Sequence, residues 1–409
     1  MKELFRVLTP TDALQLLHAN LTPQIQAERV PLAAALDRVL AEDLIAPLDV
    51  PDFARSTMDG FAVRAPDTYG ASEGLPAYLK VTGEIFMGTR ADVSVGVGET
   101  VRIATGGMLP AGADAVVMVE LTQDVDASTI EVVKPVAPGE NVLQVGEDIM
   151  AGTAVLPLGH TLRPQDLGGL ASLGIVEVVV ARKLRVAIVS GGDEVVPPDQ
   201  TPGPGQIRDV NTSTIVALVQ RAGHEPVPLG VAPDDYEAIA SLARRGMAQA
   251  DVVILSAGSS VSVRDMTADV ITSLGKPGIL VHGVSLRPGK PTILAVADGK
   301  PVFGLPGNPV SCMVTFDLFV GPTLALLSGA EAPRRQSVSA RLARNIASAA
   351  GREDYVQVKL ESRDGEVWAV PVFGKSGLIY TLIRADGMVR VELDAGGLSE
   401  GTMVPVILF

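Results

Sequence analysis

The stretch from Leu184 to Asp209, LRVAIVSGGDEVVPPDQTPGPGQIRD, decides the fold of the chain. It opens with a short, mostly apolar run that is rich in β-branched residues and breaks at a Ser-Gly-Gly loop (190–192). Such a run, ending in a glycine loop, predicts a buried strand of a parallel sheet. Two carboxylates, Asp193 and Glu194, follow the glycines directly. The stretch therefore predicts an α/β sheet with polar groups at the carboxyl end of a strand.

The same pattern occurs twice more along the chain. Residues 251–255 (DVVIL) run into a loop that begins at Ser256, and residues 301–305 (PVFGL) run into Pro306-Gly307-Asn308-Pro309. Ligands of open α/β sheets bind in the crevice outside the carboxyl ends of the strands. Three such ends within one segment therefore predict one ligand site.

Other periodicities divide the chain into further units. Apolar spacing predicts helices at 11–17 and 32–44, a helix at 164–173, and only short strands between about 60 and 138. Between the strands at 184–189 and 252–255 we expect two helices, and a long apolar helix follows Asn308. We expect a multidomain α/β-plus-β protein with a helix-bearing N-terminal domain (1–50 and 139–174), an inserted small β domain (51–138), a central three-layer α/β domain (175–329) and a C-terminal β-barrel-like domain (330–409).

Composition excludes several classes of protein. The 409 residues carry 33 basic and 47 acidic side chains, a net charge of −14, which argues against nucleic acid or an anionic membrane as the partner. Cys312 is the only cysteine, so a disulfide framework and a thiolate metal cluster are excluded, and we expect a buried core thiol. The N-terminus lacks a signal-peptide pattern and no apolar run reaches membrane-spanning length, so we expect a cytoplasmic protein.

Carboxylates beside glycine loops are the strongest chemical signal. Asp193, Glu194, Asp209 and Asp265 follow or flank the predicted strand ends. Mg²⁺ is commonly held by one or two carboxylates together with substrate phosphates, and backbone N–H groups of glycine loops and helix N-termini bind phosphate. The pattern favours a phosphate-and-metal site. The alternative is that these acids cap helices and solvate loops.

Residues 287–291, Arg-Pro-Gly-Lys-Pro, form a compact cationic turn. Prolines restrict the loop, so Arg287 and Lys290 are presented with little loss of entropy, which suits an oxyanion. The alternative is a surface turn with solvated charges. The four histidines are too scattered along the chain for a zinc site or a catalytic dyad.

Taken in order, the motifs of the chain resemble those of the molybdopterin molybdenumtransferase family, which includes bacterial MoeA and the E domains of plant Cnx and animal gephyrin. The resemblance covers essentially the whole chain. The runs that carry it are STMDGFAV (56–63), RIATG (102–106), GADAVV (112–117), GED (146–148), SGGDE (190–194), GQIRDVN (205–211), RPGKP (287–291), GLPGNPVS (304–311), GKSG (374–377) and RADG (384–387).

The resemblance implies insertion of molybdate into adenylyl-molybdopterin with release of AMP, assisted by Mg²⁺. It also implies a homodimer with an active site shared between subunits, and a partnership with the molybdopterin adenylyltransferase. The implied catalytic positions are Asp59, Thr105, Asp148, Glu194, Asp209 and Asp265, with Glu194 and Asp265 as metal ligands. The implied substrate-binding positions are Ser190, Gly191, Gly192, Ser256, Gly258, Arg287, Lys290, Pro306, Gly307, Asn308, Pro309, Ser311 and Ser376.

The implied roles follow the chemistry of these residues. Arg287, Lys290, Ser311 and Ser376 would bind a tetrahedral oxyanion. The dithiolene sulfurs that receive molybdenum belong to the substrate, so thiolate ligands from the protein are not required. Asp59, Thr105 and Asp148 would come from the side of the partner subunit that carries the inserted β domain.

The chain departs from the family pattern at two places. Ala257 and Ser262 stand where the family has glycines, and no lysine occurs a few residues before Arg287, where many members carry one. Two other functions stay open on the sequence: adenylylation of molybdopterin, and a molybdopterin-binding scaffold or carrier without turnover. The two β domains argue against the first, and the altered loop favours the second.

Overall fold

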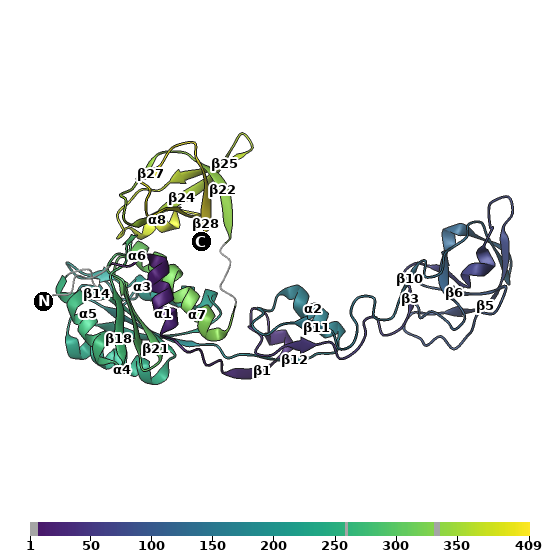
Figure 1. The fold of residues 1–409 in the computed structure, drawn as a ribbon, viewed down its shortest axis with the longest axis horizontal. Coiled ribbons are helices and arrows are strands. Elements are labelled where there is room, and N and C mark those ends of the chain that lie inside the picture. Colours follow the sequence, from purple (N-terminus) through teal and green to yellow (C-terminus); the bar gives the residue numbers. More distant parts are fainter. Residues whose placement is uncertain (1–6, 258–260, 331–335) are drawn as a thin grey trace.

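The computed structural model describes residues 7–257, 261–330 and 336–409. The molecule is elongated (Figure 1). An α/β domain and a β-barrel lie together at one end, a small middle unit follows, and a β domain lies at the far end. The predicted multidomain α/β-plus-β class is confirmed.

The α/β domain is built on a six-stranded sheet with the strand order β16-β13-β17-β21-β20-β18. The first four strands in this order are parallel, and β20 is antiparallel to both of its neighbours. The bounds are β13 Arg185–Gly191, β16 Glu225–Ala232, β17 Val252–Ala257, β18 Pro277–His282, β20 Ile293–Ala297 and β21 Lys300–Pro306. The three strand ends predicted to share an edge do so, because β13, β17 and β21 are adjacent and parallel.

Helices cover both faces of this sheet, as side-chain alternation along β13 requires. Val186 and Ile188 face one core, and Ala187 and Val189 face the other. The first face is covered by α1 (Pro10–Ala19), α3 (Asn211–Arg221), α6 (Pro309–Thr315), a π-helical turn (Phe316–Val320) and α7 (Gly321–Ser328). The second face is covered by α4 (Tyr236–Gln249) and α5 (Val261–Ser273). The result is the expected three-layer domain.

The helical stretch Pro309–Ser328 is long and apolar enough to cross a membrane by length and composition, which corrects the expectation that no run of the chain reaches that length. In the structure, 61% of its apolar window is buried inside the protein. Phe316 and Phe319 pack into the core between this stretch and the sheet. The stretch is therefore accounted for as a core helix of the α/β domain.

Helix α1 packs on the α/β sheet, although it is far from the sheet in sequence. Its Thr9 cap accepts a hydrogen bond from the Asp12 N–H (3.1 Å), and Ala13 and Leu17 are fully buried in the sheet core. The chain then leaves the domain and returns at Arg182. There the Arg182 N–H and Nε donate to the carbonyl and side-chain oxygens of Gln26 (2.7 and 2.8 Å).

The middle unit contains two short strand pairs and one helix, and here one prediction is wrong. Residues 32–44 do not form a helix: they contain a 3₁₀ turn (Leu32–Ala34), and Asp37 adopts a positive φ of 61°. Apolar side chains of this stretch pack instead against the α2 helix and β12. The elements are β1 Ala27–Pro31 with β12 Glu177–Ala181, β2 Leu44–Ile45 with β11 Ala154–Leu156, and α2 Pro164–Ser172.

The far β domain is a six-stranded sheet in the order β7-β4-β6-β5-β9-β8. Its strands are β4 Gly60–Val63, β5 Ala77–Ile85, β6 Glu99–Ile103, β7 Ala115–Met118, β8 Thr122–Asp126 and β9 Thr129–Val132, with 3₁₀ turns at Ala65–Thr68 and Val119–Leu121. A two-stranded pair, β3 (Arg55–Ser56) with β10 (Val142–Leu143), lies where the domain joins the middle unit (Figure 1). The predicted small β domain is thus present.

The C-terminal domain is a closed barrel of five strands, β24-β25-β22-β28-β26, in which β26 also pairs with β24. Its elements are β22 Ser337–Leu342, β23 Ile346–Ala347, β24 Glu353–Arg363, β25 Glu366–Pro371, α8 Ile379–Ile383, β26 Gly387–Val391, β27 Gly397–Leu398 and β28 Met403–Leu408. Strand β19 (Leu286–Arg287) of the α/β segment pairs with β24. This pairing joins the two domains.

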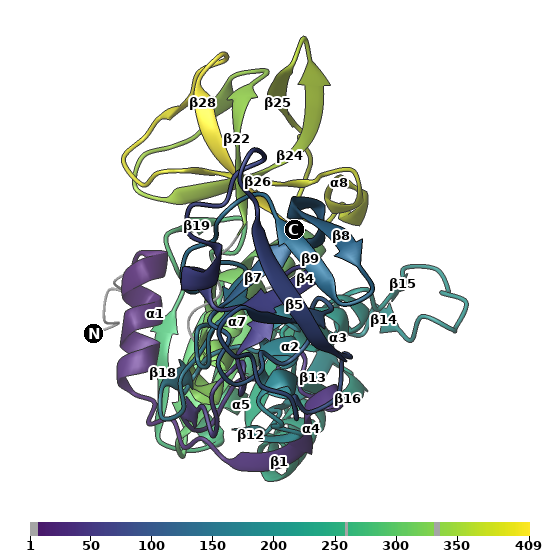
Figure 2. The same ribbon diagram turned by 90° about the vertical axis from the view of Figure 1, so that its right-hand side faces the viewer.

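The Pro/Gly loop after β13 forms a separate feature. Its strands β14 (Val195–Val196) and β15 (Ile207–Arg208) pair and project sideways from the α/β domain, as Figure 2 shows. Gly192 (φ 142°) lies at the start of the projection and Asp209 at its return. The loop thus brings Asp209 back to the sheet edge from which Asp193 and Glu194 leave.

Candidate active site

The carboxyl edge of the sheet is held together by one buried amide. Asn211 Nδ2 donates to Ser256 Oγ at the end of β17 and to the Gly307 carbonyl oxygen after β21, both at 2.8 Å. Its Oδ1 is buried without a partner among the described residues. Asn211 ends the 205–211 motif and was not among the predicted site residues, yet it links two of the three strand ends. Gly258, a predicted substrate-binding position, lies outside the described residues.

The remaining edge positions lie where the strand pattern predicts. Ser190 is buried in β13, and the Gly192 N–H donates to the Ala232 carbonyl oxygen (3.1 Å). Pro306 ends β21, and Pro309 is the first residue of α6. Cys312 is a free, fully buried thiol whose pKa burial raises to about 12, and its position confirms the prediction of a buried core cysteine.

The four predicted carboxylates do not share one environment. Asp209 is buried and accepts hydrogen bonds from the N–H and the hydroxyl of Thr212 (3.0 and 2.6 Å), so it caps α3. Asp193, Glu194 and Asp265 are exposed, the last as the fifth residue of α5. The contacts of Asp209 are therefore those of a helix cap, which was the alternative to a metal or phosphate site. Glu194 and Asp265 remain accessible to a ligand.

A third carboxylate lies beside Asp193 and Glu194. The Asp234 N–H donates to Asp193 Oδ1 (3.0 Å), and burial, followed by the charges of Asp193 and Glu194, raises the pKa of Asp234. One Asp234 oxygen is buried without a hydrogen-bond partner among the described residues. Negative charge is therefore concentrated at this end of β13.

Within the described residues, no group of three or more His, Cys, Asp or Glu side chains is placed to hold a metal ion. A cage made only of protein ligands is therefore absent from that part of the chain. Mg²⁺ held by one or two carboxylates, waters and substrate phosphates is compatible with accessible Glu194 and Asp265.

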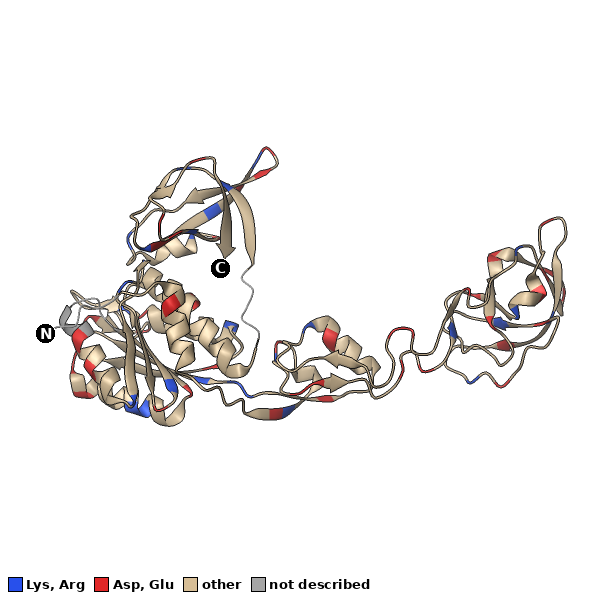
Figure 3. Cartoon of the chain, viewed as in Figure 1, with Lys and Arg blue, Asp and Glu red and all other residues tan. Residues whose placement is uncertain are grey.

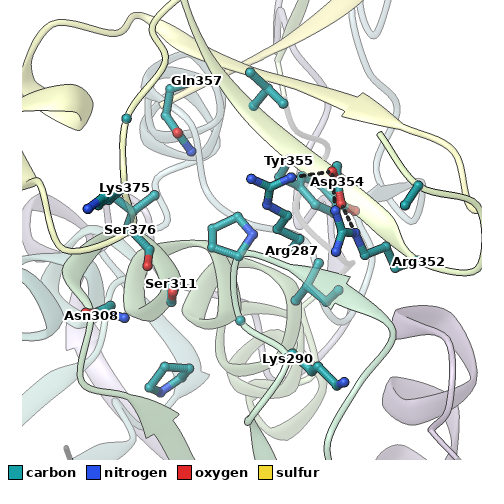
Figure 4. A pocket seen from close by; sticks show the side chains of 18 of the residues that line it. Arg287, Lys290, Asn308, Ser311, Arg352, Asp354, Tyr355, Gln357, Lys375 and Ser376 are labelled. Carbon is teal, nitrogen blue, oxygen red and sulfur yellow. Dashed lines mark hydrogen bonds and ion pairs between the residues drawn. The ribbon is translucent and has the colours of Figure 1, made fainter. Parts of the chain in front are cut away.

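A cavity of about 1130 Å³ lies between the α/β domain and the barrel. Figure 4 shows cationic and hydroxyl side chains from both domains around it. The residues that bear on an anion are Arg287, Lys290, Asn308, Ser311, Arg352, Lys375 and Ser376. The structure thus brings together the four positions assigned to oxyanion binding, and adds Arg352 and Lys375. The carboxylates Glu194, Asp209 and Asp265 do not line this cavity.

Two hydroxyl groups face each other across the domain junction. Ser311 is buried at the start of α6, and the neighbouring Val310 N–H donates to the Ser376 carbonyl oxygen of the barrel (3.1 Å). The two serine side chains lie close together in Figure 4. A hydroxyl can donate to an oxyanion from either side of this junction.

The cationic turn 287–291 is fixed by its glycine. Gly289 has a φ of 119°, and a Cβ there would lie 2.5 Å from Thr315 Cγ2. A residue with a side chain would not fit without movement of α6. Lys290 is exposed, and its side chain extends away from Arg287 and Arg352 (Figure 4). In this structure the arginines, rather than Lys290, concentrate charge at the cavity.

Two arginines are paired with one buried carboxylate. Asp354, whose side chain is 3% exposed, accepts hydrogen bonds from Arg352 (Nε, 2.8 Å) and lies 3.5 Å from Arg287 Nη1. Arg352 and Asp354 were not predicted as site residues, because no local motif marks them. Acidic and basic positions are mixed over the whole molecule (Figure 3), so the positive charge at the cavity is a local feature of an acidic protein.

The other predicted catalytic positions lie on or beside the far β domain. Asp59 Oδ1 accepts hydrogen bonds from the Thr105 N–H and hydroxyl (2.7 and 2.9 Å), and these bonds lower the pKa of Asp59. The Asp148 N–H donates to the Val50 carbonyl oxygen (3.0 Å) on the connection to the middle unit. Within one chain, the domain that carries Asp59 and Thr105 lies at the opposite end from the cavity (Figure 1).

An α/β sheet with polar loops at its carboxyl edge, joined to a barrel through a cationic cavity, is the arrangement expected of a protein that binds an anionic small molecule. The profile "MoeA N-terminal region (domain I and II)" matches residues 8–174, "Probable molybdopterin binding domain" matches 187–326, and "MoeA C-terminal region (domain IV)" matches 339–409. The chain belongs to the molybdopterin molybdenumtransferase (MoeA) family.

Individual relatives agree with this assignment over nearly the full chain. A molybdopterin molybdenumtransferase of Staphylococcus aureus is 34% identical over 390 residues, which are 95% of this chain and 93% of that protein. Molybdopterin molybdenumtransferase 2 of Mycobacterium tuberculosis is 35% identical over 92% of this chain and 94% of its own length. The crystal structure of a molybdopterin biosynthesis MoeA protein from Pyrococcus horikoshii OT3 has a TM-score of 0.87 at 32% identity, covering 99% of this chain and 100% of that one.

Proposed function

We propose that the chain inserts molybdenum into molybdopterin: it takes molybdate and adenylyl-molybdopterin, releases AMP, and acts as a homodimer in the cytoplasm. The observation that carries this proposal is the cationic cavity, in which Arg287, Arg352, Ser311 and Ser376 converge from two domains. Guanidinium and hydroxyl donors of this kind bind the oxygens of a tetrahedral oxyanion. At about 1130 Å³, the cavity also leaves room for part of an organic substrate beside the oxyanion.

The neighbouring sheet edge suits the phosphate part of the substrate. The loops after β13 and β21 would offer backbone N–H groups to phosphate oxygens, apart from the Gly192 and Val310 N–H groups, which donate to the Ala232 and Ser376 carbonyl oxygens. Glu194 and Asp265 would hold Mg²⁺ at this edge. When bound, Mg²⁺ would neutralise the negative charge that develops as a phosphoanhydride is cleaved. Asn211 ties the end of β17 to the loop after β21.

A homodimer would complete the site. Asp59 and Thr105 are bonded to each other on a domain that lies far from the cavity of its own chain. A second copy could bring them to this cavity, and the elongated shape leaves the far domain free to reach across. The adenylyltransferase that makes the substrate is a further partner of the proposed enzyme.

The decisive experiment is an AMP-release assay. Purified protein is mixed with adenylyl-molybdopterin, molybdate and Mg²⁺, and each component is omitted in turn. We expect AMP only when both molybdate and Mg²⁺ are present. Pyrophosphate from ATP and molybdopterin would instead identify an adenylyltransferase, and tight binding without AMP would identify a carrier.

The assay also tests Asp265. We expect Asp265→Asn to abolish AMP release while the circular dichroism spectrum is unchanged, because Asp265 is exposed and its removal disturbs no core. Asp269→Asn, an exposed carboxylate one turn further along α5, is the matched control and should retain the parent rate. A parent-like rate for Asp265→Asn would show that Asp265 is not catalytic.

A further inference from the structure

The two arginines at the cavity come from different domains. Arg287 ends β19 of the α/β segment, and Arg352 directly precedes β24 of the barrel. These strands pair in parallel, with Arg287 opposite Asp354, and the Glu353 N–H donates to the Ser285 carbonyl oxygen (3.0 Å). The guanidinium groups are neighbours because this pairing joins the domains.

The Asp354 carboxylate lies between the two guanidinium groups. Arg352 donates to it through Nε (2.8 Å) and Nη2 (3.4 Å), and Arg287 Nη1 is 3.5 Å from its second oxygen (Figure 4). The arginine side chains are 37% and 62% exposed, whereas that of Asp354 is 3% exposed. A guanidinium group has five N–H donors, so these contacts leave donors on both arginines for a ligand.

We propose that Asp354 is a positioning residue for oxyanion binding, which fixes Arg287 and Arg352 as one preformed, two-domain anion receptor. This inference rests on the proposed function. Long arginine side chains lose rotamer freedom when they bind a ligand, and a buried carboxylate that orders them beforehand removes part of that cost. The same carboxylate also holds the barrel and the α/β domain in the arrangement that forms the cavity.

The direction in which Asp354→Asn changes the molybdate affinity separates a positioning role of Asp354 from a purely electrostatic one. A carboxylate beside a bound oxyanion repels it, so charge alone predicts that Asp354→Asn binds molybdate more tightly. Loss of arginine positioning predicts weaker binding, by about tenfold or more, because charge-assisted hydrogen bonds to the oxyanion are lost. The two accounts predict opposite changes.

The test measures the Kd of molybdate alone by titration calorimetry on the full-length protein. Asp354→Asn is compared with Glu361→Gln, which removes a carboxylate from the same strand. Glu361 pairs with Arg363 (2.8 Å) and does not line the cavity, so its variant should bind molybdate like the parent. Unchanged or tighter molybdate binding by Asp354→Asn overturns the inference.

Two further variants separate positioning from loss of fold. Asp354→Glu keeps the charge and should recover part of the affinity. In a double-mutant cycle, Asp354→Asn should weaken molybdate binding less on the Arg352→Gln background than alone, because it acts through that arginine. Equal effects on both backgrounds would contradict the inference.

The same measurements distinguish a failure of the proposed function from a failure of the role proposed for Asp354. If Arg352→Gln and Arg287→Gln leave the molybdate Kd unchanged, the oxyanion site itself is wrongly assigned and the proposed function loses its support. If either arginine variant binds molybdate weakly while Asp354→Asn binds it tightly, the site stands and only the positioning role of Asp354 is refuted.

Discussion

Gly289 offers a test of how the cationic turn is built. In Gly289→Ala the new Cβ would lie 2.5 Å from Thr315 Cγ2 and 3.0 Å from Leu286 Cδ2. Thr315 is fully buried and its hydroxyl donates to the Ser311 carbonyl oxygen (2.8 Å), so it has little room to move. Backbone strain at positive φ costs about 1–2 kcal/mol, and overpacking costs about 1–3 kcal/mol. We expect a loss of about 2–5 kcal/mol in the free energy of unfolding.

Gly299→Ala is the matched control. Gly299 also has a positive φ (84°), but no atom lies within 4 Å of the position that a Cβ would occupy there. It should therefore show only the cost of backbone strain, about 1–2 kcal/mol. The difference between the two variants isolates the contact with Thr315.

Urea unfolding followed by circular dichroism measures both variants. Because a multidomain chain need not unfold in one step, hydrogen exchange of β20 and β21 should be measured alongside it. We also expect molybdate binding to weaken in Gly289→Ala, since Arg287 and Lys290 flank the altered residue. Equal destabilisation by the two substitutions would refute the packing argument.

Two further predictions concern titration and assembly. Burial lowers the pKa of His224 to about 4, and its Nδ1 accepts the Leu184 N–H (3.3 Å). In the unfolded chain the His224 imidazole becomes protonated near pH 6.5, whereas in the folded chain it stays neutral down to about pH 4. The free energy of unfolding therefore keeps its full His224 contribution above pH 6.5 and loses up to about 3 kcal/mol as the pH falls towards 4. Urea midpoints across this range should fall less steeply in His224→Gln, and an identical slope would contradict the assignment. If the site is shared between subunits, Asp59→Asn and Asp265→Asn chains that are each inactive alone should regain activity when they are refolded together. Half of the dimers are then mixed and each mixed dimer carries one intact site of two, so the AMP-release rate should reach about a quarter of the parent rate. No recovery would argue for sites within single chains.

Much of the fold could be predicted because its strong signals are local. The β-branched runs at 184–189 and 252–255 end in glycine loops, and the sheet edge follows from them. Strand β16 (Glu225–Ala232) was not predicted, because Pro226 and Pro228 interrupt its pattern. The strand lies at the edge of the sheet, where missing N–H groups are tolerated.

The helix expected at 32–44 shows where local periodicity misleads. Ala35, Leu40 and Leu44 are buried as a helical pattern would suggest, but Leu36 is 46% exposed. Leu40 pairs with Val180 of a distant segment. Tertiary pairing therefore overrides a weak helical preference.

Some residues of the candidate site could be predicted from local sequence motifs, and others could not. Arg287 and Ser311 stand in compact motifs beside strand or helix ends, and sequence alone could select them. Arg352 and Asp354 become site residues only when β19 pairs with β24, a contact between distant segments that no local pattern encodes. Asp209 carries a motif signal as well, yet its observed contacts are those of a helix cap.

The pair formed by Gln26 and Arg182 has a mechanical consequence. Both chain crossings into the middle unit and the far β domain are anchored there. Residues 27–181 therefore form an arm that is attached to the α/β domain at its near end, where Gly159 also approaches Gly329 and Asp37 approaches Gly223. A slight tilt at this base would move the tip through a wide arc. Conversely, a molecule that binds the far β domain would also fix the angle of the arm at the Gln26–Arg182 pair.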